Sequence, residues 1–340
     1  MEIEETYNQI INKIEQNKEF VIIPHHNPDG DAMGSALAFK SMLDKLGKRA
    51  NVVTTNDYPE FLHWLPKNES VVVWFKNKYK AKALIEKADV IIFVDFSQLS
   101  RIEEFNSKMF EGKVKILFDH HPDTEDFPDL QITDTRVSST SELVGRFFME
   151  TKYAKLLDKN IASCLLTGII TDTGSFNHNS SRAETYEVLT TLLRTGVNKD
   201  QIYDRIYNNF SFDRTRLLGY MLNEKLVNLP DYKTAYMCLT QEEMIKYKFQ
   251  HGDSEGFVNV PLEIKNIIFS VFFIEKKDRV KISFRSSGSF PANELAKKYF
   301  NGGGHKNAAG GYCKLSMPET IKRFEEAIEE YKAILNTSVI

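Results

Sequence analysis

Cysteine is scarce in this sequence of 340 residues. The three cysteines, Cys164, Cys238 and Cys313, are widely separated and odd in number, and no two of them form a CxxC pair. This usage argues against a scaffold held together by disulfides. It indicates reduced thiols, as in a cytoplasmic protein.

Long apolar runs are absent as well. The longest, such as VIIF, are short and strand-like, whereas a membrane-spanning helix needs about 20 apolar residues. The opening residues MEIEETYNQI are acidic and amphipathic and lack the apolar core of a signal peptide. We therefore expect no membrane association and a cytoplasmic location.

The chain also has little net charge, −3 at pH 7. A protein that holds a long duplex needs a basic surface, because binding neutralises many phosphates and releases their counterions. The charge balance therefore argues against long duplex nucleic acid as a partner. A short anionic substrate, held by a few local contacts, stays allowed.

Material for a hydrophobic core is plentiful. Apolar residues make up 42% of the chain and charged residues 27%, with 24 Phe and 14 Tyr, as in a globular protein. The length fits two domains. We predict a first domain over residues 1–195, a charged helical linker over 196–230 and a second domain over 231–340.

Strands and helices alternate along the predicted first domain. Helical patterns lie between and after short apolar runs, which predict strands over 20–24, 51–55, 71–75, 89–95 and 114–119. This alternation favours right-handed crossovers and a mainly parallel sheet, so the expected fold class is α/β with flanking helices. The run Ser138–Ser141 is most simply the N-cap of the helix that follows it.

The pattern changes in the second domain, which we expect to be a smaller α/β domain. Two of its strands are joined by the polar turn KKD and predict a hairpin. The predicted elements are strands over 232–240, 267–275 and 279–285, a helix over 291–300, a glycine-rich loop over 301–311 and a terminal helix opened by Pro318.

Acidic and histidine residues follow the ends of the predicted parallel strands. In an open parallel sheet, ligands bind beyond the carboxyl ends of the strands, so these side chains should meet in one crevice. The residues are His25, Asp29, Asp31, Asp95, Asp119, His120 and His121, with Asp172 added by the segment GIITDTGSF.

Several carboxylates in one crevice repel one another, and divalent cations remove that penalty. Carboxylate and imidazole ligands suit Mn²⁺, with Mg²⁺, Zn²⁺ or Co²⁺ as alternatives. Two such cations would bind the attacking and leaving oxygens of a phosphoryl transfer. Any single Asp after a strand is more simply a solvated loop acid, but the combination of segments favours a metal centre.

The segments HHNPDGDAMGS, VDFS, FDHHP and GIITDTGSF resemble the four motifs of the DHH phosphoesterase superfamily. The segment FRSSGSFPANELAKKYFNGGGHKNAAGG resembles the GGGH signature of its DHHA1 substrate domain. The resemblance covers almost the whole chain, and the compact two-domain form is similar to the NrnA type of nanoRNase and pAp phosphatase. It implies a two-metal hydrolase with its active site in a cleft between the two domains.

The resemblance also implies a role for each matching residue. His121 would face the scissile phosphate as an acid or electrostatic stabiliser, and Asp119 would orient its neighbours. The metal ligands would be His25 and Asp29 for one ion, Asp31, His120 and Asp172 for the other, and Asp95 as the bridge between them.

The glycine run of the second domain removes side chains where backbone N–H groups could approach a phosphate. A neighbouring Arg and His could add charge-assisted hydrogen bonds. Taken alone, such a run is more often a plain flexible loop. The resemblance implies that the domain binds the terminal phosphate or nucleotide of the substrate. The candidate residues are Arg285, Ser286, Gly302, Gly303, Gly304 and His305.

The leading hypothesis is an enzyme that hydrolyses very short oligoribonucleotides to 5′-mononucleotides, pAp to AMP, or both. One alternative is a phosphodiesterase of cyclic or linear dinucleotides such as c-di-AMP and pApA. Another, of a different class, is a non-catalytic nucleotide-binding regulator, for which a damaged acidic cluster would be expected. The expected partners are a short RNA or nucleotide, no long duplex and no membrane. Two-domain enzymes of this family are often homodimers, although no segment identifies an interface.

Overall fold

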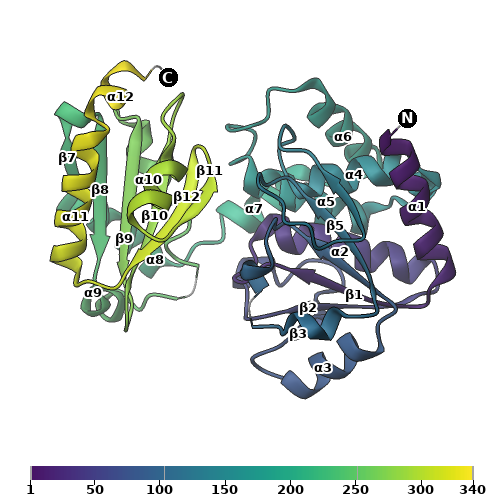
Figure 1. Ribbon diagram of the computed structural model, residues 1–340. Coiled ribbons are helices and arrows are strands. Elements are labelled where there is room, and N and C mark those ends of the chain that lie inside the picture. The colour runs from purple at the N-terminus through teal and green to yellow at the C-terminus, as the bar shows by residue number, and fades with distance from the viewer. Residues whose placement is uncertain (1, 103, 251, 339–340) are drawn as a thin grey trace. The chain divides into compact units, whose positions relative to one another are not determined.

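The computed structural model describes residues 2–102, 104–250 and 252–338, and it consists of two compact units (Figure 1). The first unit spans Met1–Asn209 and the second Phe210–Ile340. The chain therefore passes from one unit to the other inside the predicted linker. The predicted domain boundaries and the predicted cleft stay predictions.

The first unit is built on a six-stranded sheet with the order β3-β2-β1-β4-β5-β6. All neighbouring strands are parallel, which confirms the predicted α/β fold. The chain moves outward from β1 to β3 and then returns to place β4 on the other side of β1. Ligands bind at such a reversal of strand order. The strands are β1 (Glu19–Pro24), β2 (Arg49–Thr54), β3 (Val72–Val73), β4 (Val90–Val94), β5 (Val114–Asp119) and β6 (Leu130–Thr133).

The central strands of this sheet are buried on both faces. In β1, Phe20 and Ile22 belong to one hydrophobic core, whereas Val21 and Ile23 belong to the core on the opposite face. Burial on both faces explains why these strands are continuous apolar runs in the sequence. The edge strand β6 has no such run, and the sequence does not predict it.

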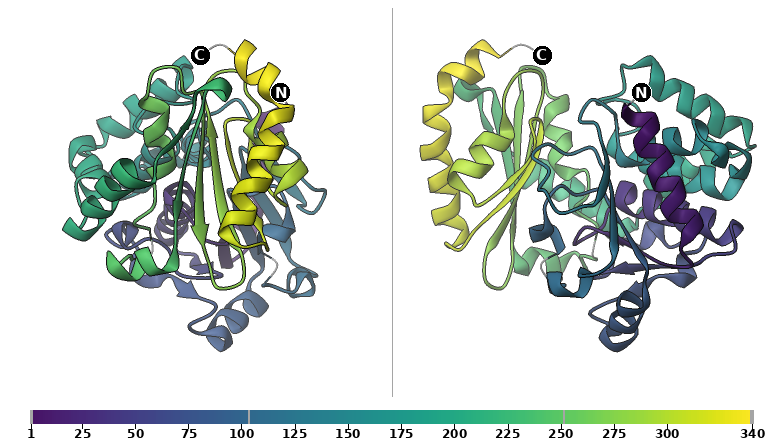
Figure 2. Two further views of the ribbon diagram at one scale, coloured as in Figure 1. Left: turned by 90° about the vertical axis from the view of Figure 1, so that its left-hand side faces the viewer. Right: turned by 45° about the vertical axis from the view of Figure 1, so that its right-hand side comes forward.

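Helices cover both faces of the first sheet (Figure 2). Gly47, just beyond the end of α2, has a φ of +70°, as the glycine that ends a helix commonly does. The helices are α1 (Glu2–Gln16), α2 (Gly30–Lys45), α3 (Lys78–Lys87), α4 (Thr140–Met149), α5 (Lys159–Asp172), α6 (Ala183–Arg194) and α7 (Lys199–Tyr207). Short 3₁₀ helices lie at Glu60–Leu62, Asn68–Ser70, Leu99–Ile102, Ser107–Phe110 and Lys152–Leu156.

The second unit has a mixed six-stranded sheet with the order β11-β12-β10-β9-β8-β7. Strands β8 and β9 are parallel, and the other neighbours are antiparallel. The pairing of β9 with β10 confirms the predicted hairpin. The strands are β7 (Val227–Leu229), β8 (Thr234–Leu239), β9 (Phe269–Glu275), β10 (Val280–Ser286), β11 (Gly303–His305) and β12 (Ala308–Cys313).

Separate hydrophobic cores cover the two faces of this second sheet. Ile282 and Phe284 of β10 pack with α10 and α11, whereas Phe272 and Ile274 of β9 pack with α8 and η8 on the other face. The helices are α8 (Phe212–Tyr220), η6 (Met221–Lys225), η7 (Pro230–Tyr232), α9 (Gln241–Lys246), η8 (Phe257–Glu263), α10 (Ala292–Tyr299), α11 (Met317–Glu330) and α12 (Lys332–Thr337). The single predicted terminal helix is thus divided into α11 and α12. Across the described parts of both units, no helix combines the length and apolarity needed to cross a membrane.

The prediction of a glycine-rich loop over 301–311 is wrong. These residues form most of the hairpin of β11 and β12, and β12 also pairs with β10. A side chain at Gly302 would overlap the carbonyl oxygen of Gly310, and one at Gly304 would overlap that of Ala308. These two glycines therefore permit a close approach of two backbones. Pairing with β10, rather than intrinsic propensity, determines the strands.

Candidate metal centre

The predicted histidine and acidic residues meet at the carboxyl ends of three neighbouring strands. His25 directly follows β1, Asp95 directly follows β4, and Asp119 ends β5, with His120 and His121 next in the chain. Since β1, β4 and β5 are adjacent and parallel, their ends bring the five side chains to one edge of the sheet.

Helix ends supply the remaining acids. Asp29 is the N-cap of α2, and its Oδ1 accepts hydrogen bonds from the backbone N–H groups of Asp31 and Ala32 at 3.0 and 3.1 Å. Asp31 lies in the first turn of α2, and Asp172 is the last residue of α5. The helix termini therefore point their carboxylates towards the same edge as the strands.

His25, Asp29 and Asp95 form one group in which a ligand atom of each lies within 4.8 Å of the others. The Nε2 atom of His25 lies 3.5 Å from Asp95 Oδ2 and 3.9 Å from Asp29 Oδ2. This group has the atoms and the spacing to hold one metal ion.

Asp31, Asp95 and His120 form a second group with the same spacing. The Nε2 atom of His120 lies 3.6 Å from Asp95 Oδ1, 3.9 Å from Asp31 Oδ2 and 3.5 Å from Asp172 Oδ2. Asp95 thus belongs to both groups and turns a different carboxylate oxygen towards each histidine.

The hydrogen bond of His25 tests whether the first group suits a cation. Its Nδ1 lies 2.8 Å from the carbonyl oxygen of His26. A carbonyl oxygen only accepts, so Nδ1 carries the proton. Burial, the largest influence, lowers the pKa of His25, and the neutral ring then turns the lone pair of Nε2 towards the carboxylates. His25 Nε2 and the carboxylate oxygens that it faces are all acceptors, so they cannot hydrogen-bond to one another. A metal ion between them would bind both.

Two carboxylates of the cluster, those of Asp95 and Asp31, are unfavourable as anions without a cation. Burial, followed by the charges of Asp31 and Asp29, raises the pKa of Asp95 well above its ordinary value. Burial also raises the pKa of Asp31. A divalent cation reverses this balance because it favours the ionised form of each carboxylate. The electrostatics and the donor types therefore both fit a metal centre.

Asp95 adopts a backbone conformation that is uncommon for a non-glycine residue, with a φ of +68°. Such a conformation persists only when the surroundings hold it. The backbone N–H of Asp95 donates to Phe118 O at 2.9 Å, and the hydroxyl of Thr140 donates to Asp95 Oδ1 at 2.9 Å. The strand end and α4 together fix the shared carboxylate.

The sequence does not predict that α4 contributes residues to the site. Ser139 is the N-cap of this helix, as the serine-rich run predicts, but the next two residues contact the acids. The backbone N–H of Thr140 donates to Asp31 Oδ2 at 2.7 Å, and that of Ser141 donates to Asp31 Oδ1 at 2.8 Å. A helix N-terminus stabilises a carboxylate in this way. Thr140 and Ser141 lie within a candidate cap in the sequence, which is the only local signal of their role.

Gly168 of α5 makes room for this network. A Cβ atom at this position would overlap the hydroxyl of Ser141 and lie 2.7 Å from Asp31 Oδ1. Glycine at 168 therefore lets α5 pack directly behind the carboxylate of Asp31, so that the same helix can present Asp172 at its end.

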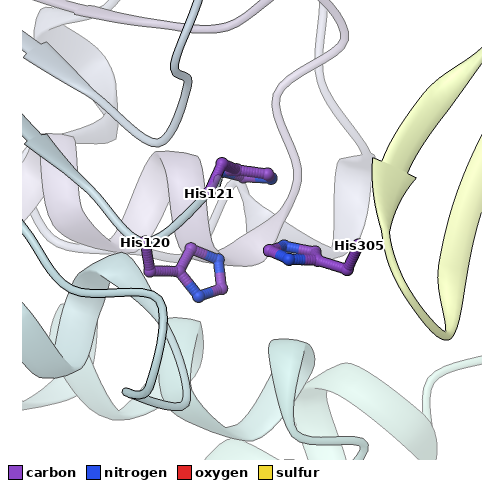
Figure 3. Close-up of side chains that lie close together, drawn as sticks. All are labelled: His120, His121 and His305. Carbon is purple, nitrogen blue, oxygen red and sulfur yellow. The ribbon is translucent and has the colours of Figure 1, made fainter. Parts of the chain in front are cut away.

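His121 is held by Asp119. Its Nδ1 donates to Asp119 Oδ1 at 2.8 Å, and Figure 3 shows the rings of His120 and His121, whose centroids are 4.8 Å apart. Burial raises the pKa of Asp119 to about 6. Burial, followed by the charge of His120, lowers the pKa of His121 well below its ordinary value. With Nδ1 engaged, the side chain presents Nε2 as its second functional atom.

The predicted substrate residues of the second unit lie on β10 and the β11–β12 hairpin. Arg285 and His305 both stand opposite Ala308, so they share one row and one face of the sheet. The hydroxyl of Ser286 donates to Phe290 O and accepts from Asn307, each at 2.8 Å. Ser286 therefore has structural partners within the unit. The space beside Gly303 is open, since a Cβ atom added there would meet no described atom within 4 Å.

Two known domain families match the chain in order. Residues 19–169 match the DHH family N-terminal domain, and residues 232–336 match the DHHA1 domain. The two matched segments lie in different compact units.

Relatives match over nearly the full chain. A probable bifunctional oligoribonuclease and PAP phosphatase NrnA from Streptococcus mutans is 27% identical over 97% of this chain and 99% of its own. The bifunctional oligoribonuclease and PAP phosphatase NrnA from Thermus thermophilus is 30% identical over 91% of this chain and 89% of its own. A crystal structure of an exopolyphosphatase-related protein from Bacteroides fragilis is 42% identical, with a TM-score of 0.94 over 98% of both chains. The chain therefore belongs to the DHH family of phosphoesterases.

Proposed function

We propose that this phosphoesterase binds two divalent cations and hydrolyses very short oligoribonucleotides to 5′-mononucleotides, pAp to AMP, or both. The observation that carries the proposal is the shared carboxylate of Asp95. Its Oδ2 lies 3.5 Å from His25 Nε2, and its Oδ1 lies 3.6 Å from His120 Nε2. Each oxygen of this carboxylate would thus be available to a different cation of a two-metal site.

The proposed ligands form two sets that share Asp95: His25 with Asp29, and Asp31 with His120 and Asp172. When bound, the cations would supply an activated water and Lewis-acid stabilisation of the phosphoryl group. Carboxylate and imidazole donors suit Mn²⁺, with Mg²⁺ and Co²⁺ as alternatives.

We assign His121 to the scissile phosphate. The hydrogen bond from its Nδ1 to Asp119 fixes the ring and leaves Nε2 for the substrate. Nε2 can there exchange a proton with an oxygen of the phosphate or its leaving group. Asp119 acts through His121, because it holds the ring in one tautomer and one orientation.

The second unit is proposed to bind the substrate. Arg285 and His305 supply cationic or hydrogen-bonding groups in one row, and the open position at Gly303 lets a phosphate approach the backbone. The names of the NrnA relatives support oligoribonucleotides and pAp as the substrate class. The small net charge, −3, supports a short substrate over a long duplex. A cytoplasmic location and a homodimer are further parts of the proposal.

The test is a side-by-side turnover assay with Mn²⁺ on pAp, an RNA dinucleotide, a long RNA, c-di-AMP and pyrophosphate. We expect rapid cleavage of pAp and the dinucleotide, with the long RNA spared. A preference for c-di-AMP would replace the proposed substrate and keep the metal chemistry. Tight nucleotide binding without turnover of any substrate would instead support the non-catalytic regulator.

A further inference from the structure

One face of the second sheet carries cationic and aromatic groups in addition to the predicted substrate residues. Lys281, Ser283 and Arg285 of β10 share this face because side chains alternate along a strand. The intervening Ile282 and Phe284 are buried in the core on the other side.

The strand register extends the face across β12 and β11. Tyr312 stands opposite Lys281, and Ala308 stands opposite both Arg285 and His305. One end of the face therefore carries Lys281 and Tyr312. The other end carries Arg285 and His305, the histidine that Figure 3 labels on β11.

Between these ends the surface has no large side chain. Gly310 stands opposite both Ser283 and Gly303. Gly302 and Gly304 are needed for close packing of the backbones, but a Cβ at Gly303 would meet nothing within 4 Å. The middle of the face is therefore a strip without large side chains between the two charged ends.

Lys281 is exposed, and it makes no ion pair or hydrogen bond through its side chain with any residue that the structure describes. The guanidinium of Arg279 lies 5.3 Å from the centroid of the Tyr312 ring, but it also pairs with Asp278 at 3.1 Å, so among the described residues Lys281 is the unpaired cation at this end. In contrast, α8 and η8 cover the same face of the sheet at β9. The Lys281 end is thus a cationic, partly aromatic surface with no assigned role in the fold.

We propose that Lys281 and Tyr312 form a second substrate subsite, which binds a nucleotide beyond those held by Arg285 and His305. This inference rests on the proposed function. Lys281 and Arg285 are four residues apart in an extended strand, about 13 Å, so a ligand that reaches both must be extended. Cations for the phosphates and an aromatic ring for a base are the usual means of binding a single strand. The subsite therefore favours oligoribonucleotides of three or more nucleotides.

The kinetic test compares Lys281→Ala with Lys297→Ala. Lys297 is an exposed lysine on α10, which packs on the opposite face of the sheet, so the two variants lose the same charge. KM and kcat would be measured for RNA of two and of four nucleotides. We expect Lys281→Ala to lower the ratio of kcat/KM for the tetranucleotide over the dinucleotide about tenfold, mainly through KM, because one charge-assisted contact is lost. Lys297→Ala should leave this ratio unchanged.

A binding test needs no turnover. The affinity for a fluorescent tetranucleotide would be measured in EDTA over a range of salt concentrations. Lys281→Ala should reduce the slope of log affinity against log salt by about 0.7, the value for one phosphate contact on a single strand. Tyr312→Ala should weaken binding several-fold, and Tyr312→Phe should retain it because the ring is kept.

The subsite would be overturned if Lys281→Ala and Lys297→Ala had the same ratio of kcat/KM for the tetranucleotide over the dinucleotide and the same slope of log affinity against log salt. The proposed function would stay intact. A wild-type enzyme that cleaves neither RNA nor pAp would overturn the proposed function instead. The binding test then decides the subsite alone, since an unchanged slope rejects it and a reduced slope supports it.

Discussion

The candidate functional residues of the two units are held in contrasting ways. In the first unit most of them are buried and have fixed partners, as when both oxygens of Asp31 accept hydrogen bonds from the N-terminus of α4. In the second unit Arg285 and His305 are half-buried, and strand register places them in one row. A metal centre needs donors fixed to within a fraction of an ångström, whereas a surface for short nucleic acids must accept several ligands.

This contrast predicts that substitutions in the two units impair the enzyme in different ways. Changes in the first unit should remove cations and turnover, because each carboxylate depends on its neighbours. Changes on the face of β10 should mainly weaken substrate binding, because each contact acts more independently.

Asp95→Asn should have the largest effect. It removes the charge of the shared carboxylate but keeps an oxygen that the Thr140 hydroxyl can donate to. Loss of groups that merely support a metal ligand costs about 10–100-fold, so loss of a bridging ligand should lower kcat by at least about 100-fold. Steady-state kinetics with Mn²⁺ would check this. Near-normal turnover would show that the metal assignment is wrong.

Gly168→Ala tests the packing behind Asp31. The added methyl group would overlap Ser141, and we expect the free energy of unfolding to fall by about 1–3 kcal/mol. Gly219→Ala on α8 is the matched control, since nothing lies within 4 Å of its Cβ position and alanine favours a helix by about 0.5–1 kcal/mol. Urea denaturation would measure both. Similar stabilities of the two variants would contradict the close packing at Gly168.

Thr140→Ala should have a moderate effect, because it removes the hydroxyl that donates to Asp95. We expect Mn²⁺ affinity to fall about tenfold, and Thr140→Ser to restore it. Titration calorimetry would compare the three proteins. If serine fails to restore the affinity, the threonine methyl group rather than the hydrogen bond is what matters.

Arg285→Ala tests the contrast in the second unit. We expect KM for the dinucleotide to rise about tenfold with little change in kcat, because the arginine is proposed to bind the substrate and not a cation. A pure loss of kcat with an unchanged KM would contradict this role.

The smallest effect concerns stability without metal. Burial and neighbouring charges raise the pKa of Asp95, so its ionised form destabilises the metal-free fold at pH 7. In EDTA, Asp95→Asn should therefore raise Tm by a few degrees. With Mn²⁺ the order should reverse, because bound cations stabilise the wild-type native state. Thermal melts in both buffers would check this, and a lower Tm for the variant in both would argue against repulsion at this site.

The sequence predicts the fold best for strands that are buried on both faces. Strands β4 and β5 are buried on both faces, and their apolar runs are visible without any structure. Strands β11 and β12 contain Gly303, Gly304, Gly310 and Gly311, which have little strand propensity. Their strand form depends on pairing with β10, which local sequence cannot show.

The same distinction holds in the candidate site. His25, Asp95 and the DHH segment were predictable because their chemistry lies in the side chains and their spacing follows strand ends. Thr140 and Ser141 instead donate backbone N–H groups to Asp31, which lies more than 100 positions away, and the hydroxyl of Thr140 donates to Asp95. Only the packing of α4 against α2 reveals that contact.

The most direct test of the metal centre is the number of Mn²⁺ ions bound per chain, measured by mass spectrometry of the metal after equilibrium dialysis. We expect two ions for the wild-type protein and one or none for Asp95→Asn, with Lys297→Ala as a control that keeps two. A wild-type protein that binds no more than one ion, or an Asp95→Asn variant that keeps both, would contradict a centre built around a shared carboxylate.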